Sequence, residues 1–421
     1  MSGAHPGRER VTVSRTGAGV VIVGAGHAGG TAAALLRSYG YAEPITLIGE
    51  EPIAPYQRPP LSKAWLKGEA DAESLMLKPE SFYAGAGIEL VLGARVTSLK
   101  RSERTVCLAD GRSFAYDSLI LAMGARARAL PIRGADLAGV LSLRSASDAE
   151  ALKGALGPGR RLAVVGGGYI GLEVAASARF LGAEVVVIER EAAILARVAK
   201  EPLCSFLTRY HEARGVAFEV GAMVEAFEGE AGHVTGVRLA GRRAVACDAV
   251  LIGVGLARND DLAREAGLEC VAGVVVDGEA RTADPQVFAI GDVTHRPIPH
   301  YARMFWLESV ANALEQARQA ASIIAGRPAP PHEVTWNWSD QYDLKLQFAG
   351  LAFDIDDMVV RGDPAGAKFA VFHLKGDTVQ AVEAVNAPAE FMAGRQLIGQ
   401  RRPISRARLA DTAVSMKEVA A

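Results

Sequence analysis

The sequence predicts an α/β protein with two similar domains of the parallel-sheet type, followed by a small C-terminal α+β domain. Two similar domains are indicated by a pattern of strand, glycine-rich turn, helix and strand, which occurs at residues 19–50 and again at 161–189. The small domain is indicated by apolar alternation typical of antiparallel strands, which follows the Pro- and Gly-rich residues 326–331. A chain of 421 residues, 50% hydrophobic, is long enough for two or three cores.

The first pattern contains the glycine motif G-A-G-H-A-G at residues 24–29. Gly24 permits a tight turn, Gly26 lets a pyrophosphate approach the backbone, and Gly29 lets the helix pack close to the strand. The helix N-terminus would then present N–H groups and a positive dipole end to the phosphates. Glu50, which follows the next strand, can accept hydrogen bonds from a ribose. The expected elements are a strand at 19–23, a helix from about 29 to 39 and a strand at 45–49.

The second pattern contains the glycine motif G-G-G-Y-I-G at residues 166–171, and its glycines are expected to have the same roles as those of the first motif. Glu189, at the end of the following strand, should bind the 2′-hydroxyl of NAD and repel the 2′-phosphate of NADP. Arg190 and Arg197 leave NADP open, because a nearby arginine can accept that phosphate. The expected elements are a strand at 162–165, a helix at 171–181 and a strand at 184–189.

Further elements are expected outside the two repeats. Short strands are predicted around 95–122 and within 248–292, and the helix with the best apolar period runs from 308 to 324. In the C-terminal part, residues 368–374 and 378–385 alternate around Lys375-Gly376-Asp377, which predicts a hairpin, and a helix follows from about 388 to 400.

Two dinucleotide-binding units imply two dinucleotides, one a held cofactor and the other a transient substrate. Neither unit supplies a redox group, so a flavin is expected as the middle carrier. The strand-like segment 282–292 ends in Gly291-Asp292 and resembles the ribityl-binding stretch of flavoprotein reductases that bind two dinucleotides. Standing alone, Asp292 is also compatible with a helix cap.

Four further segments carry a family resemblance: PYQRPPLSK at 55–63, LAMGAR at 121–126, ESVANALEQA at 308–317 and WNWSDQY at 336–342. Over nearly its whole length, the chain resembles the NADH-dependent ferredoxin reductases of oxygenase systems. The resemblance implies a glutathione-reductase-like pair of Rossmann-like domains plus a C-terminal domain, with FAD and NAD as cofactors. The implied domains are 17–126 with 247–326 for FAD, 127–246 for NAD, and 327–421 as an interface domain.

The resemblance also assigns residues to the cofactors. Arg58 and Arg126 contact the FAD, Val96 meets its adenine through the backbone, and Lys63 and Trp338 lie near the flavin ring. Taken alone, the arginines and Lys63 are compatible with solvated surface and Trp338 with core. The residues expected to bind the two cofactors are Gly24, Gly26, His27, Ala28, Gly29, Glu50, Arg58, Lys63, Val96, Ala122, Gly124, Arg126, Asp292, Trp338, Gly166, Gly168, Tyr169, Ile170, Gly171, Glu189 and Gly255.

Lys63 and Glu173 are the candidate catalytic residues. Reduced flavin carries negative charge, so a nearby cation such as Lys63 favours the reduced state. Glu173, expected in the first helical turn after the second motif, is a candidate partner of Lys63 when NADH is bound. A glutamate there also suits the helix dipole without any other role. Two departures from the family are Met123, where Thr is common, and Arg258, where Pro is usual; the second puts the stiffness of that loop in doubt.

The expected mechanism is hydride transfer from NADH to FAD, followed by two one-electron transfers to a [2Fe–2S] ferredoxin. Hydride transfer requires close stacking, at about 3–3.5 Å, and no general base. The four cysteines form no C-x-x-C pair or metal-ligand pattern, so electrons must leave the flavin directly and no metal site is expected. The ferredoxin would supply a cytochrome monooxygenase or a ring-hydroxylating dioxygenase. Alternatives are a rubredoxin or small-molecule acceptor, or a non-catalytic NADH-sensing flavoprotein.

Composition limits the partners and the location. A net charge of −2 gives no reason to expect nucleic acid or an anionic membrane surface as a partner. No stretch approaches the about 18–20 apolar residues of a membrane span. Residues 1–16 are polar and lack the apolar core of a signal peptide, which predicts a short disordered leader on a cytoplasmic protein. A monomer and a weak homodimer are both compatible with the sequence.

Overall fold

The two glycine motifs lie in two different units of the fold. The structure is a computed structural model and describes residues 17–420, so the leader predicted for residues 1–16 lies outside the described residues. Within the described residues, unit 1 consists of 17–56, 76–124 and 258–332, and unit 2 consists of 57–75, 125–257 and 333–420.

Unit 1 is built on a parallel sheet of five strands in the order β19-β7-β1-β2-β3, with the strand before the first glycine motif at its centre. Because side chains alternate along a strand, Val20 and Ile22 of β1 join a different core cluster from Val21 and Val23. The sheet is therefore buried on both faces, as parallel sheets usually are. Its strands are β1 (Val20–Val23), β2 (Ile45–Ile48), β3 (Ile88–Val91), β7 (Ser118–Leu121) and β19 (Val287–Ala289).

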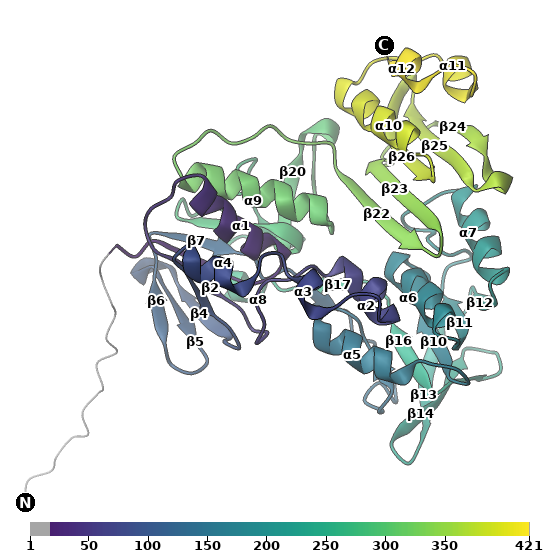
Figure 1. The fold of residues 1–421 in the computed structure, drawn as a ribbon, viewed down its shortest axis with the longest axis horizontal. Coiled ribbons are helices and arrows are strands. Elements are labelled where there is room, and N and C mark those ends of the chain that lie inside the picture. Colours follow the sequence, from purple (N-terminus) through teal and green to yellow (C-terminus); the bar gives the residue numbers. More distant parts are fainter. Residues whose placement is uncertain (1–16, 421) are drawn as a thin grey trace, which may run out of the picture. The chain divides into compact units, whose positions relative to one another are not determined.

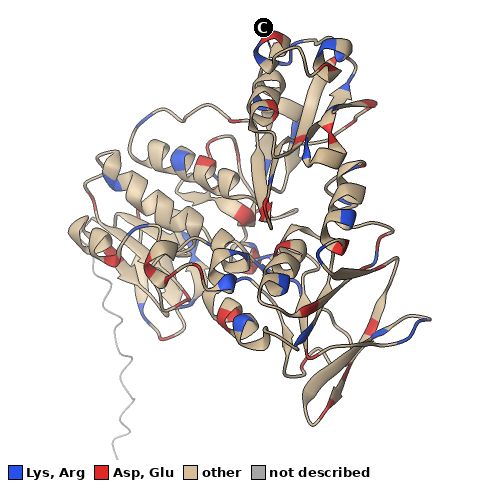
Figure 2. Cartoon of the chain, turned by 45° about the vertical axis from the view of Figure 1, so that its right-hand side comes forward, with Lys and Arg blue, Asp and Glu red and all other residues tan. Residues whose placement is uncertain are grey.

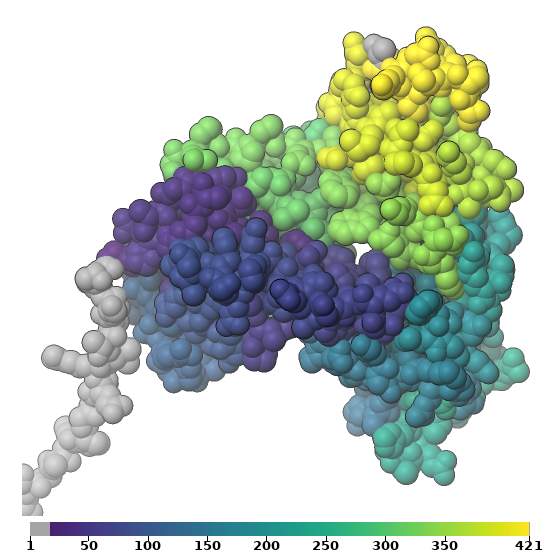
Figure 3. All heavy atoms as spheres, viewed as in Figure 1, coloured from purple at the N-terminus to yellow at the C-terminus, as the bar shows by residue number. Residues whose placement is uncertain are grey.

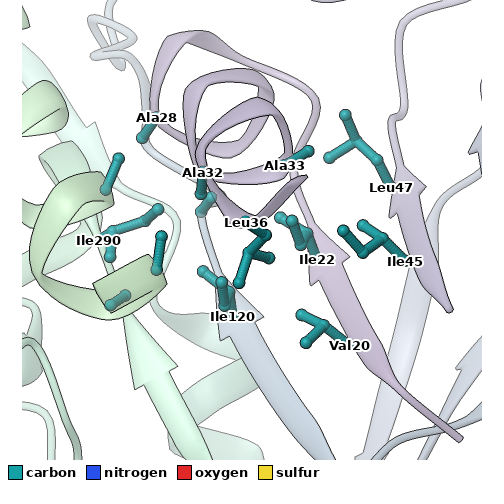
Figure 4. Packing of buried hydrophobic residues seen from close by; sticks show 14 of the residues in the cluster. Val20, Ile22, Ala28, Ala32, Ala33, Leu36, Ile45, Leu47, Ile120 and Ile290 are labelled. Carbon is teal, nitrogen blue, oxygen red and sulfur yellow. The ribbon is translucent and has the colours of Figure 1, made fainter. Parts of the chain in front are cut away.

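Helices α1 (His27–Ser38) and α9 (Val310–Ile324) pack side by side on one face of this sheet (Figure 1). In Figure 4, Ala32, Ala33 and Leu36 of α1 point toward the strand residues Val20, Ile22 and Ile120. The helix therefore lies close to the sheet because small residues line its inner face. The other face is covered by the meander β4 (Val96–Lys100), β5 (Thr105–Leu108) and β6 (Ser113–Ala115).

Smaller elements complete unit 1. The helix expected from 308 begins at Val310, because the Ser309 side chain accepts a hydrogen bond from Asn312 N and caps it. The remaining elements are α4 (Glu80–Gly85), η2 (Arg101–Glu103), α8 (Asp261–Glu265), β18 (Val274–Val275), η3 (Gly291–Val293), β20 (Thr294–Ile298), η4 (Pro299–Tyr301) and β21 (Arg303–Phe305).

Unit 2 contains a second five-stranded parallel sheet, in the order β12-β11-β10-β16-β9. Its strands are β9 (Val140–Leu141), β10 (Arg161–Val165), β11 (Glu184–Glu189), β12 (Val216–Val220) and β16 (Ala249–Ile252). Around it lie η1 (Pro59–Ser62), α2 (Ala64–Lys67), α3 (Ala72–Leu75), β8 (Ala125–Ala127), α5 (Ala146–Ala155), α6 (Tyr169–Phe180), α7 (Leu203–Glu212), β13 (Val224–Glu230), β14 (His233–Leu239), β15 (Val245–Ala246) and β17 (Leu256–Arg258).

The C-terminal part of unit 2 is an antiparallel sheet in the order β22-β23-β26-β25-β24, with α10 packed on it. The hairpin predicted around Lys375-Gly376-Asp377 is present, with Lys375 opposite Thr378 and Gly376 at φ +58. The predicted fold class is confirmed. The elements are β22 (Trp336–Gln341), β23 (Leu344–Gly350), β24 (Asp357–Asp363), η5 (Pro364–Gly366), β25 (Lys368–Lys375), β26 (Thr378–Val385), α10 (Pro388–Gln400), α11 (Arg406–Ala410) and α12 (Met416–Ala420).

The C-terminal sheet packs on α6 and α7, so both parts belong to one compact unit. The ring centroids of Phe206 and Phe369 lie 5.2 Å apart, and those of Tyr169 and Phe348 lie 4.8 Å apart. In Figure 3 the yellow-green spheres of this sheet adjoin the teal spheres of α7 without a break. Aromatic contacts of this kind add to the stabilisation that burial provides.

The three predicted domains remain a prediction, because the two compact units divide the chain along different lines. Residues 57–75 cluster with unit 2 because their short helices pack on α5 and α6. Unit 2 continues to residue 257, because β16 pairs with β10 of the second sheet. Its C-terminal segment begins at 333.

Charges of both signs are interspersed over the described part of the chain (Figure 2). Among residues 17–420, no helix has the length and apolarity needed to cross a membrane. Within the same residues, no group of three or more His, Cys, Asp or Glu side chains is placed to hold a metal ion.

Candidate active site

The first glycine loop has two glycines that the fold itself requires. Gly24 has φ +113, and a Cβ there would lie 2.3 Å from the carbonyl oxygen of Ala122. A Cβ on Gly29 would lie 1.9 Å from the carbonyl oxygen of Gly24. Both positions therefore exclude a side chain for reasons internal to the protein, namely the tight turn and the close packing of α1.

Gly26 differs from its two neighbours in the motif. Its φ of −83 is open to any residue, and an added Cβ would meet nothing within 4 Å. Gly26 is also the N-cap of α1, so the first-turn N–H groups of His27, Ala28 and Gly29 face this space. An open cradle beside a helix N-terminus is what the pyrophosphate of a dinucleotide requires, so the loop fits the predicted cofactor.

The other predicted residues of unit 1 lie at the carboxyl ends of the parallel strands that carry this loop. Glu50 follows β2, and its exposed side chain lies 3.6 Å from Arg95. Ala122 follows β7 and contacts Gly24, and Gly124 turns the chain at φ +62. The carboxyl edge of an open α/β sheet is where such folds bind ligands. Val96, also in unit 1, is the first residue of β4.

Asp292 lies beside the first glycine loop. It follows β19 in the 3₁₀ turn η3, and a Cβ on the preceding Gly291 would lie 3.1 Å from the Cβ of Ala28 in α1. Gln316 of α9 fixes this turn by accepting hydrogen bonds from Gly291 N at 2.8 Å and from the Thr294 hydroxyl at 2.9 Å. The turn that carries Asp292 is therefore held by buried side chains.

Two residues near Asp292 were not found by sequence reasoning. Trp306 donates its indole N–H to the carbonyl oxygen of Asp292 at 2.6 Å. The guanidinium of Arg258 lies 3.7 Å from the centre of the Trp306 ring. In the sequence, Arg258 stands out only as a departure from the family pattern, and no signal there connects it to Trp306.

The doubt about the loop that contains Arg258 is resolved by the next residue. Asn259 donates its backbone N–H to the carbonyl oxygen of Gly124 at 3.0 Å, and its side-chain amide to that of Met123 at 2.9 Å. These two hydrogen bonds tie the loop that contains Arg258 to the turn at Gly124.

The second glycine loop, in unit 2, repeats the geometry of the first. A Cβ on Gly166, at φ +109, would lie 2.4 Å from the carbonyl oxygen of Gly253, and one on Gly171 would lie 2.3 Å from that of Gly166. A Cβ on Gly168, the N-cap of α6, would meet nothing within 4 Å. Glu189 accepts hydrogen bonds from Gly167 N at 2.7 Å and Glu191 N at 2.9 Å, which fixes its carboxylate beside the loop.

Three other predicted residues accompany this loop. The ring of Tyr169 packs on Phe348, and burial raises the pKa of its hydroxyl well above the usual range. Ile170 is 42% exposed at the start of α6. Gly255 has φ +99, and its carbonyl oxygen accepts a hydrogen bond from Arg128 N at 3.0 Å.

Lys63 and Glu173 are paired in unit 2. The ammonium nitrogen of Lys63 lies 2.8 Å from Glu173 Oε2, and the side chains are 16% and 5% exposed. The Ser62 hydroxyl donates to the same oxygen. We expected Glu173 in the first turn of its helix. It lies beyond the first turn, because α6 begins within the motif, at Tyr169. The helix-dipole explanation of Glu173 therefore loses its basis, since that effect is confined to the first turn.

Arg58, Arg126 and Trp338 also lie in unit 2, as Lys63 does, whereas the other residues expected at the flavin lie in unit 1. Arg58 donates to the carbonyl oxygen of Arg144. Arg126 is exposed on β8. Trp338 is half-buried on β22, with its ring centroid 5.6 Å from that of Trp336.

The four cysteines are separate thiols. Burial raises the pKa of Cys204 to about 11 and that of Cys247 to about 12, so neither is a thiolate near neutral pH. Burial also raises the pKa of Cys270. The chain therefore offers no dithiol through which electrons could leave a flavin.

Comparison with known proteins identifies the family. The model of the pyridine nucleotide-disulphide oxidoreductases matches residues 18–322, and that of the reductase C-terminal domain matches residues 336–420. The chain belongs to the pyridine nucleotide-disulphide oxidoreductases. Its predicted place among the ferredoxin reductases of that family, its oxidoreductase class, and FAD and NAD as cofactors are confirmed.

Individual oxidoreductases resemble the chain over almost its whole length. It is 53% identical over 402 residues to a probable ferredoxin reductase, CtmF, of Castellaniella defragrans, covering 95% of this chain and 98% of that protein. It is 39% identical to a rubredoxin-NAD(+) reductase of Pseudomonas putida, covering 88% and 96%. Among solved structures, the covalent putidaredoxin reductase–putidaredoxin complex aligns with a TM-score of 0.93 and 40% identity, covering 95% and 97%.

Proposed function

We propose that this oxidoreductase transfers electrons from NADH to a small [2Fe–2S] ferredoxin that supplies a cytochrome monooxygenase or a ring-hydroxylating dioxygenase. The observation that carries the proposal is the pair of open cradles at Gly26 and Gly168, one for a held cofactor and one for a substrate. The absence of a dithiol supports a one-electron acceptor, because the relatives that reduce disulfides pass electrons through paired cysteines. Bound FAD would supply the chemistry by accepting hydride from NADH and releasing two electrons singly.

The side chains have distinct proposed roles. In unit 1, the first glycine loop, Glu50 and Asp292 hold the flavin nucleotide. In unit 2, the second glycine loop and Glu189 hold NADH, while the ammonium of Lys63 stabilises negative charge on the reduced cofactor. Glu173 keeps that ammonium in place. These residue roles, and a monomeric or weakly dimeric state in the cytoplasm, are part of the proposal.

Glu189→Ala is expected to reduce the preference for NADH over NADPH by at least about tenfold, because the fixed carboxylate repels a 2′-phosphate. The quantity to measure is the ratio of kcat/KM for NADH to kcat/KM for NADPH. A ratio is needed because loss of the hydrogen bond from Gly167 N would lower kcat/KM for both nucleotides. Glu184→Ala is the matched control, because this exposed carboxylate lies at the opposite end of the same strand, β11. An unchanged ratio in the Glu189 variant would remove the residue from nucleotide discrimination.

The acceptor is tested by NADH-driven reduction of cytochrome c with and without a panel of [2Fe–2S] ferredoxins. Strong stimulation by at least one ferredoxin is expected, because the ferredoxin would accept single electrons from the flavin and pass them on to cytochrome c. Rubredoxin and a quinone form the comparison arms. Rapid bleaching of the flavin by NADH with stimulation only by rubredoxin or quinone would reject the ferredoxin. A long-lived reduced complex that no acceptor discharges would support an NADH-sensing role.

A further inference from the structure

A row of buried hydrogen bonds joins Glu173 to a histidine that has no assigned role. Ser339 donates its hydroxyl to Glu173 Oε1 at 2.6 Å, and Gln341 Nε2 donates to the Ser339 hydroxyl at 3.0 Å. The oxygen of the Gln341 amide lies 2.8 Å from His211 Nε2. We call these four residues the Glu173–His211 network. They come from α6, β22 and α7, all within unit 2.

The network is shielded from water. Ser339, Gln341 and His211 are each 0% exposed, and Glu173 is 5% exposed. Ser339 and Gln341 face the same side of β22 because they are two residues apart, and Trp336 and Trp338 occupy the other side. Each polar group in such a place must find a partner within the protein, because an unsatisfied buried donor or acceptor costs about 1–3 kcal/mol.

The direction of every hydrogen bond follows from the carboxylate. Glu173 only accepts, so Ser339 must donate to it. The Ser339 oxygen then accepts from the amide nitrogen of Gln341, which turns the amide oxygen toward His211. His211 must therefore donate from Nε2, which defines its neutral tautomer.

The hydrogen-bond partner of His211 Nδ1 is consistent with this tautomer. His211 Nδ1 carries the lone pair in that tautomer and lies 3.4 Å from the Tyr342 hydroxyl, which can donate to it. Burial, with a smaller contribution from the positive charge of Arg214, lowers the pKa of His211 to about 4. The imidazole is therefore neutral at neutral pH, and the network keeps one direction.

The two oxygens of Glu173 serve different partners. Oε2 accepts from Lys63 at 2.8 Å and from Ser62, while Oε1 accepts from Ser339. Without the Ser339 hydroxyl, Oε1 would be buried with no donor and the carboxylate would have reason to rotate. Any rotation would loosen the contact with the Lys63 ammonium.

We infer that Ser339, Gln341 and His211 are positioning residues, which fix the rotation of the Glu173 carboxylate and thereby hold the Lys63 ammonium in its place. The C-terminal sheet thus contributes to the Lys63–Glu173 pair through β22 although it contains no nucleotide motif. This inference rests on the proposed role of the Lys63–Glu173 pair.

The first test is kinetic. Ser339→Ala is expected to lower the limiting rate of flavin reduction by NADH about tenfold, the equivalent of one charge-assisted hydrogen bond, with little change in the apparent Kd for NADH. Thr208→Val is the matched control, since its hydroxyl donates to the Cys204 carbonyl oxygen at 2.9 Å within α7, outside the network and away from Lys63. Equal rates in the two variants would overturn the inference. Wild-type rates in Lys63→Met would overturn the role of the pair itself.

The second test follows the hydrogens and does not depend on turnover. In Glu173→Gln, the Lys63 ammonium should attract the new amide oxygen, so the amide nitrogen faces Ser339. Ser339 must then donate to Gln341, whose amide reverses and donates to His211. The expected result is a switch of His211 from the Nε2–H to the Nδ1–H tautomer.

The tautomer is read from long-range ¹H–¹⁵N spectra of the holoenzyme labelled with ¹⁵N-histidine at pH 7, with the His211 signals assigned by a His211→Gln variant. A switch in Glu173→Gln, with the wild-type tautomer retained in Thr208→Val, would establish that the carboxylate and the imidazole are coupled. Retention of the Nε2–H tautomer in Glu173→Gln would overturn the coupling.

Discussion

A Gly26→Ala variant is expected to fold like the parent protein but to purify with little or no bound flavin. The added methyl group meets no protein atom within 4 Å, and φ −83 suits alanine, so the fold has no reason to reject it. The methyl group would instead occupy the space in which the pyrophosphate approaches the backbone. The loss of the cap preference of glycine over alanine costs about 1 kcal/mol or less.

The result is measured as flavin absorbance per protein together with the Tm of the apoprotein. Gly29→Ala provides the contrast, since its Cβ would lie 1.9 Å from a backbone oxygen and should lower the Tm itself. Gly168→Ala extends the comparison to unit 2, where flavin should be retained and the KM for NADH should rise. A Gly26→Ala protein that keeps its full flavin content would contradict the proposed cradle.

Lys63→Met should slow the reduction of the flavin by NADH about 10²-fold while FAD remains bound, the effect expected from removing one preorganised charge next to a developing negative charge. The same change leaves the Glu173 carboxylate buried without its cation. Breaking a buried ion pair in this way costs up to about 3–5 kcal/mol of stability, so a loss of stability is expected as well.

A double variant separates the two effects. In Lys63→Met/Glu173→Gln the unpaired charge is gone, so the Tm should recover toward that of the parent, while the slow reduction should persist. Stopped-flow reduction at saturating NADH and thermal unfolding of the same samples give both quantities. Recovery of the reduction rate in the double variant would mean that the unpaired carboxylate, and not the missing ammonium, had caused the slow step.

The sequence predicted where in the fold the locally determined parts of the candidate site lie, while their binding roles stay a prediction. The places of both glycine loops, of the acidic residues after the following strands and of the turn at Asp292 were predictable because each combines characteristic residue types at a fixed spacing. The hairpin around Gly376 was predictable for the same reason, since a short polar turn interrupts two alternating segments.

Other features depend on contacts between segments that are distant in the sequence, so the sequence alone could not predict them. The contact of Trp306 with Asp292 and the support of Met123 by Asn259 require knowledge of which loops adjoin. The position of Glu173 was misjudged by one turn because α6 begins inside the glycine motif. The grouping of residues 57–75 with unit 2 also depends on distant contacts, since Ser62 and Lys63 bind Glu173 of α6.

The strand order of unit 1 has a consequence for how the protein is made. β19 forms one edge of the sheet and pairs with β7, where Val287 lies opposite Leu119. This edge strand is therefore synthesised long after the other four strands of the sheet. Asp292 and the covering helix α9 also emerge after most of unit 2. A nascent chain that has just finished β7 thus exposes the apolar edge of an incomplete parallel sheet, a state prone to aggregation. If the flavin is held by Asp292, as we propose, its capture is a late event in biosynthesis.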